Sequence, residues 1–217
     1  MSPHSHPCRR PLPPGNLYLV GYRCTGKTSI GLRLAQRLNR VFVDCDQRVT
    51  TTAGMTVTDI VSREGWAGFR QRECRVLKDI ARTENRVVAT GGGIVGDVAN
   101  RWNMRRSGIV VWLTASVPVI AARMTADPIT GDQRPALSQA PLEKEIVQTL
   151  TARIPLYANT AHFHVITDNR SFEGICDEIL HRLTARIARC EKRFEPRRSL
   201  RLCARTRFGL RQSRAMP

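Results

Sequence analysis

Short apolar runs alternate with longer amphipathic runs along most of this chain. The first apolar run, at 17–20, is followed by an amphipathic run that places Ile30, Leu34 and Leu38 on one side of a helix. Similar pairs of runs recur as far as about residue 190. Strands that alternate with helices in this way predict an α/β fold, in which helices cover both faces of a parallel sheet.

The same pattern sets the expected boundaries of the strands and helices. Gly65 separates two of the helices, because glycine favours the end of a helix. The five expected strands are 17–20, 41–43, 86–90, 108–114 and a short one that includes 165–166. The expected helices are 28–40, 56–63, 66–82, 116–125, 142–157 and 171–190.

A phosphate-binding loop lies between the first strand and the first helix. The segment 21–28, GYRCTGKT, fits the spacing of Gly, four free residues, Gly, Lys and Ser or Thr. Backbone N–H groups of such a loop bind phosphate oxygens, Lys27 reaches the terminal phosphates, and the Thr28 hydroxyl binds Mg²⁺. The motif predicts an ATP or GTP site in a three-layer P-loop fold. The other expected nucleotide contacts are Gly21, Cys24, Thr25, Gly26 and Ser29.

Two carboxylates follow the second expected strand. Asp44 and Asp46 stand at positions i and i+2, so they project to one side of an extended chain. Ligands bind at the carboxyl ends of parallel strands in open α/β sheets, and close like charges are unfavourable unless a metal or a substrate hydroxyl uses them. The pair therefore indicates a ligand site, with the alternative that Asp46 only caps the next helix.

Glycines and arginines supply a second group of candidate residues. The three glycines 91–93 end the third expected strand, where free N–H groups can bind an anion. Arg70 and Glu73 are neighbours on one helix, so Glu73 can orient Arg70. Such ion pairs are common on surfaces, and position alone does not make Arg70 functional.

The segment 126–141 interrupts the alternation of strands and helices. It contains three prolines, a glycine and Arg134. A structureless segment of this length inside a compact domain is usually a functional lid or a disordered excursion. We expect a mobile lid here.

Charge and composition separate a central domain from its ends. The net charge is +17, and the part from Arg182 onward carries twelve Lys and Arg against two Glu, which leaves +7 for the rest. The first sixteen residues are rich in proline and lack the apolar stretch of a secretory signal. We expect a disordered leader at 1–16, one domain at 17–185 and a basic tail at 186–217.

The composition excludes several classes of protein. No run approaches the 18 apolar residues of a membrane span. Seven cysteines without regular spacing fit neither a disulfide framework nor a zinc site. We therefore expect a cytoplasmic enzyme.

Five motifs in order give the chain a resemblance to the shikimate kinases over residues 16–185. This family transfers the γ-phosphoryl group of ATP to the 3-hydroxyl of shikimate in the biosynthesis of chorismate and the aromatic amino acids. The motifs are GYRCTGKT, FVDCD at 42–46, GFR at 68–70 with Glu73, TGGG at 90–93, and QRPAL followed by RIPLY from Arg153.

The resemblance implies a role for each candidate residue. Asp46 would contact the ring hydroxyls as base or aligner, and Asp44 would join Thr28 at Mg²⁺. The substrate carboxylate would be held by Arg70, Arg153, Gly92 and Gly93, and the nucleotide side would be lined by Arg123, Arg134 and Arg170.

Departures from the family pattern leave alternatives open. Cys24 and Cys45 stand where small residues are more usual, and the lid is longer than in compact members between Arg123 and Arg134. Another small-molecule kinase, such as a gluconate kinase, shares the loop and the fold. A kinase-like protein that binds nucleic acid through its basic tail is a further alternative. We expect a monomer that acts on a small molecule, with no membrane partner.

Overall fold

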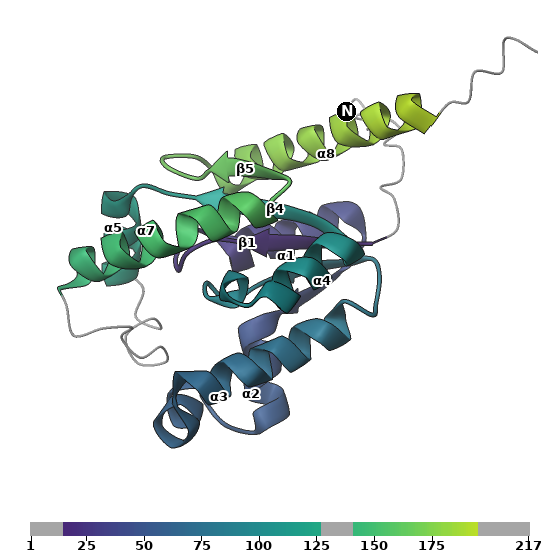
Figure 1. The fold of residues 1–217 in the computed structure, drawn as a ribbon. Coiled ribbons are helices and arrows are strands. Elements are labelled where there is room, and N and C mark those ends of the chain that lie inside the picture. The colour runs from purple at the N-terminus through teal and green to yellow at the C-terminus, as the bar shows by residue number, and fades with distance from the viewer. Residues whose placement is uncertain (1–14, 127–140, 195–217) are drawn as a thin grey trace, which may run out of the picture.

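The sheet has five parallel strands in the order β2-β3-β1-β4-β5, so the predicted fold class is confirmed (Figure 1). The computed structural model describes residues 15–126 and 141–194. Central β1 pairs with β3 and β4 and is buried throughout. The strands are β1 (Asn16–Val20), β2 (Val41–Asp44), β3 (Arg86–Ala89), β4 (Gly108–Thr114) and β5 (Phe163–Ile166).

β1 begins one residue earlier than predicted. Asn16, which we assigned to the leader, is 2% exposed and belongs to the strand. Its side-chain amide donates to the carbonyls of Ile80 and Thr83 at 3.2 and 2.8 Å, and its oxygen accepts from the Arg86 N–H at 3.0 Å. Because every polar atom of the side chain has a partner, a polar residue is tolerated where the pattern predicted none.

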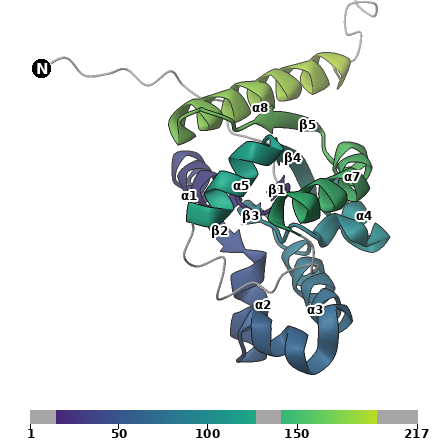
Figure 2. The same ribbon diagram turned by 90° about the vertical axis from the view of Figure 1, so that its left-hand side faces the viewer.

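Alternate residues of β1 pack on opposite faces of the sheet. Leu17 and Leu19 contact the core cluster that includes residues of α1 and α8. Tyr18 and Val20 contact the cluster beneath α3 and α4. Figure 2 shows α8 on one side of the sheet and α3 on the other, as a three-layer arrangement requires.

The described helices include two that the pattern did not predict, α2 and α4. The predicted break at Gly65 is confirmed, because its φ of 67° and ψ of 177° are not helical and interrupt α3. The helices are α1 (Lys27–Leu38), α2 (Cys45–Ala53), α3 (Val57–Ile80), the short 3-10 helix η1 (Ile94–Gly96), α4 (Val98–Ser107), α5 (Val117–Ala126), α7 (Leu142–Thr160) and α8 (Phe172–Phe194).

The start of α2 shows that the alternative role of Asp46, as the cap of this helix, was wrong. Asp44, and not Asp46, is the N-cap, since its Oδ1 accepts from the N–H groups of Asp46 and Gln47 at 3.0 and 3.3 Å. Asp46 lies in the first helical turn. The helix begins between the two aspartates, so they do not project from one extended strand as predicted.

The ends of the expected domains lie partly outside the described residues. The lid, including Arg134, falls there except for Ala126 and Pro141, which end α5 and precede α7. The same holds for most of the leader and the tail. Among the residues that are described, no helix has the length and apolar character needed to cross a membrane.

Candidate active site

The phosphate loop follows β1 in a conformation that depends on glycine. Gly21 has φ 146°, and a Cβ there would lie 2.3 Å from the Leu113 carbonyl oxygen, so a larger residue would displace the loop from β4. Cys24 and Gly26 also have positive φ, at 56° and 88°. Gly26 is the N-cap of α1 and has no side chain to cap it, so the positive end of the helix faces the loop. Loops of this shape bind anions.

Side chains from the start of α1 and the end of β2 meet beside the loop. Lys27 Nζ donates to the Tyr22 carbonyl at 2.6 Å, and Thr28 Oγ1 donates to Asp44 Oδ2 at 2.9 Å. A hydroxyl and a carboxylate oxygen are ligands that Mg²⁺ accepts, and Mg²⁺ usually takes only one or two from protein. The pair fits this ion, although the described residues contain no group of three His, Cys, Asp or Glu that could hold a metal.

Two hollows adjoin at the carboxyl ends of the strands. The larger is a cleft of about 1060 Å³ that runs from the phosphate loop to Thr56 at the start of α3. The smaller is a pocket of about 40 Å³ between Arg70 and Arg153. Asp46 lines both, as do Val57 and Gly92. The arrangement provides a large and a small compartment that meet at one carboxylate.

Arg70 is held rigidly at the wall of the small pocket. Its Nη1 donates to Glu73 Oε2 at 2.5 Å, and its guanidinium lies 5.2 Å from the Phe69 ring centroid and 5.4 Å from that of Trp66. A Cβ on Gly93 would lie 2.3 Å from Arg70 Cζ, so the guanidinium packs directly on the glycine backbone. The cation therefore has a fixed position, as a binding site for a carboxylate requires.

Glu73 is fully buried beneath Arg70. Burial raises the pKa of its carboxyl to about 7, against the opposing effect of the Arg70 charge. Its Oε1 has no hydrogen-bond partner in the part of the chain that the structure describes. The oxygen faces Gly91, where a Cβ would lie 2.1 Å from it and 2.8 Å from Asp46 Oδ1. Both carboxyl groups thus lie so close to the backbone at Gly91 that only glycine fits there.

We expect Gly91→Ala to lower both stability and turnover. The new methyl group would push Glu73 and Asp46 apart, at a cost of about 1–3 kcal/mol for overpacking. The matched control is Gly96→Ala, because a Cβ there meets nothing within 4 Å. Urea unfolding and steady-state kinetics on the two variants would check this. Equal behaviour of the two variants would show that the approach at Gly91 is unimportant.

Arg153 reaches the same pocket from α7. Its Nη1 donates to the Gly92 carbonyl at 3.2 Å, and the Tyr157 hydroxyl donates to the same oxygen. The Gly92 carbonyl therefore fixes Arg153. Burial raises the pKa of Tyr157 to about 12, so its hydroxyl stays a donor at neutral pH. Tyr157 was not among the predicted site residues, although it is the last residue of RIPLY.

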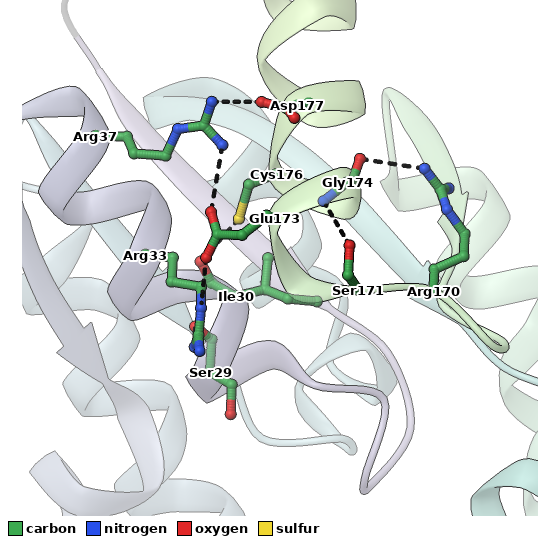
Figure 3. A network of polar contacts seen from close by, with 10 residues as sticks. All are labelled: Ser29, Ile30, Arg33, Arg37, Arg170, Ser171, Glu173, Gly174, Cys176 and Asp177. Carbon is green, nitrogen blue, oxygen red and sulfur yellow. Dashed lines mark hydrogen bonds and ion pairs between the residues drawn. The ribbon is translucent and has the colours of Figure 1, made fainter. Parts of the chain in front are cut away.

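The two described arginines on the expected nucleotide side differ in position. Arg123 of α5 lies against the phosphate loop, where it donates to the Cys24 carbonyl at 3.2 Å and to Thr167 Oγ1 at 3.1 Å. Arg170 instead donates to the Gly174 carbonyl at 3.2 Å (Figure 3). It also pairs with Glu178. Arg170 does not line the cleft, because these partners hold it at the start of α8.

Helix α1, which carries the phosphate loop, is tied to α8 by charged pairs (Figure 3). Arg33 Nε lies 3.0 Å from Glu173 Oε1, and Arg37 pairs with Asp177. Phe172 packs beside the loop, 3.6 Å from the Cβ position of Gly26. Exposed pairs each contribute little, about 0–1 kcal/mol. Together with this packing they hold the start of α1 against α8.

Comparison with known proteins gives consistent results. The family described as "Shikimate kinase" matches residues 23–184. "Shikimate kinase 2" of Sodalis glossinidius (strain morsitans) is 42% identical over 168 residues, which cover 77% of this chain and 95% of that protein. The protein of the same name from Escherichia coli O81 (strain ED1a) is 44% identical over 161 residues, covering 74% and 91%.

A solved structure agrees with these sequence matches. The shikimate kinase from Acinetobacter baumannii, determined in complex with shikimate, superposes with a TM-score of 0.75 at 33% identity. The match covers 79% of this chain and 94% of that one.

Proposed function

This chain belongs to the shikimate kinase family and phosphorylates shikimate with ATP, and we propose that its two compartments divide the reaction. In this proposal the cleft holds ATP, and shikimate lies where the small pocket opens into the cleft, with its carboxylate in the small pocket. The observation that carries it is the position of Asp46, which lines both hollows. The phosphoryl group passes directly from donor to acceptor, so the two substrates must meet where their compartments join.

The donor compartment binds the triphosphate through the loop backbone and Lys27. The positive φ values at Cys24 and Gly26 and the start of α1 support this assignment. Thr28 and Asp44 would hold Mg²⁺, which supplies positive charge to the phosphate oxygens. Arg123 supports the loop from behind, and the resemblance assigns Arg134 to close over the phosphates.

The acceptor compartment binds shikimate at both ends. Arg70 and Arg153 hold the carboxylate through charge-assisted hydrogen bonds, and the N–H groups of Gly92 and Gly93 assist them. Aromatic walls at Trp66 and Phe69, together with Val57, exclude water and strengthen these contacts. Those walls were not foreseen, because apolar residues within a helix are equally expected in a core.

Asp46 aligns the 3-hydroxyl and takes its proton as the oxygen attacks the γ-phosphorus. Phosphoryl transfer requires alignment and charge neutralisation more than covalent chemistry by the protein. Lys27 and Arg134 neutralise the charge that develops on the transferred group. Gluconate also has a carboxylate for the clamp, so the preference for shikimate comes from the aromatic walls, which suit a ring, and from the fixed separation between the clamp and Asp46.

We expect Thr28→Val to raise the Mg²⁺ concentration needed for half-maximal rate by about 10-fold or more. Valine keeps the shape of the side chain but removes the hydroxyl that lies 2.9 Å from Asp44. The control is Thr50→Val, which removes a hydroxyl elsewhere on the cleft wall. Titration of the rate with Mg²⁺ at saturating ATP measures the effect. Identical Mg²⁺ curves for the two variants would exclude Thr28 as a ligand.

We also propose that the enzyme works in the cytoplasm as a monomer. Free cysteines at 24, 45, 74 and 176 suit a reducing compartment.

A further inference from the structure

A second cavity lies behind the two arginines of the acceptor pocket. It has a volume of about 710 Å³ and opens between α3, α4 and α7. Arg70, Gly93 and Arg153 line both this rear cavity and the acceptor pocket. One pair of cations therefore faces two separate spaces.

The rear cavity combines positive charge with an apolar wall. Arg75 adds a third cation, and Leu156 and Ala152 of α7 supply apolar surface. Of the two carboxylates on the lining, Glu73 is buried and paired with Arg70. The other, Asp97, caps α4 by accepting from the Asn100 N–H at 2.8 Å. Apart from these two carboxylates, the groups on the lining are cationic, neutral polar or apolar.

We propose that the rear cavity is a second binding site, which takes a small carboxylate with an apolar body and thereby weakens binding of the acceptor. The volume falls within the range of about 300–1,000 Å³ typical of small-molecule sites. This inference rests on the proposed function, in which Arg70 and Arg153 hold the acceptor carboxylate.

The shared arginines determine the sign of the coupling. Arg70 gives an Nη1 N–H to Glu73, and Arg153 gives one to the Gly92 carbonyl, so most of the five N–H donors of each guanidinium remain for ligands. Carboxylates on both sides would share the same two positive charges and repel each other, so each would bind more weakly in the presence of the other. Binding of the acceptor then weakens binding of the rear ligand by the same factor, because coupling between binding sites is reciprocal.

Cys74 provides a readout that does not depend on catalysis. It lines the rear cavity, is partly exposed and accepts from the Asn100 side chain at 3.1 Å. We expect benzoate, used as the probe, to slow alkylation of Cys74 by iodoacetamide, as followed by peptide mass spectrometry. Benzamide, which is neutral, should have no effect. Cys24 reports on the nucleotide cleft and should react at an unchanged rate.

Steady-state kinetics then distinguish binding of benzoate at the rear site from direct competition between benzoate and shikimate. Benzoate should raise the KM for shikimate about 5-fold or more to a plateau, with kcat unchanged. Arg75→Gln should keep the normal KM without benzoate and lose both the benzoate effect and the protection of Cys74. A KM that rises without limit, unprotected Cys74, or full benzoate sensitivity in Arg75→Gln would overturn the inference. Failure of the proposed function would instead appear as a normal KM in Arg70→Ala without any benzoate.

Discussion

Replacing Asp46 with asparagine is expected to reduce turnover by about 10²- to 10⁴-fold, the range of a general base, while ATP still binds. The amide keeps the size of the side chain but neither accepts the proton of the 3-hydroxyl nor carries the charge that orients it. Asp46 lies in the first turn of α2 and lines both compartments, so the loop that binds ATP is not altered. Steady-state kinetics and calorimetric titration with ATP measure the two effects separately.

The control for this substitution is Asp79→Asn. Asp79 is exposed near the end of α3, where it pairs with Arg82 at 3.3 Å. This variant should retain normal turnover. Near-normal turnover in Asp46→Asn would show that the acceptor hydroxyl lies elsewhere.

Replacing Arg70 with alanine is expected to raise the KM for shikimate by the equivalent of about 2–5 kcal/mol, the cost of removing one partner of a buried charge pair. The change removes a carboxylate ligand and also leaves Glu73 buried without its ion pair. We therefore expect a loss of folding stability as well, because an uncompensated buried carboxyl is costly. The KM for ATP should change little.

Arg72→Ala is the matched control for Arg70. Arg72 stands two residues away on the same helix and pairs with Glu64 at 2.6 Å, outside both compartments. Its removal should leave both KM values and turnover unchanged. The clamp would be contradicted if Arg70→Ala and Arg72→Ala gave the same KM for shikimate.

The fold followed from the apolar pattern except where that pattern is weak. The five strands are runs of apolar residues, and β4 has the predicted bounds. Helix α4 was missed because it buries only Asn100 and Met104 and therefore shows no apolar periodicity. Helix α2 was missed because its three threonines are poor helix formers, and Asp44 caps it from the strand.

Several residues of the candidate site were predicted from motifs in which the spacing between residues is fixed. Lys27, Thr28 and Asp44 lie together as expected, because the carboxyl ends of parallel strands meet at one edge. The contact of Tyr157 with the Gly92 carbonyl joins residues 65 positions apart, which no local pattern reveals. The partners of Arg170 lie only four and eight residues further along the chain, but the sequence does not show that its side chain turns back to the start of α8.

The most direct test of the whole account is release of ADP with shikimate or gluconate as the acceptor. A coupled assay on the full chain, at saturating ATP and Mg²⁺, compares the two at equal concentrations. A carboxylate clamp at a fixed separation from Asp46, with aromatic walls that suit a ring, predicts rapid release with shikimate and only background release with gluconate. Release with gluconate but not with shikimate would contradict it.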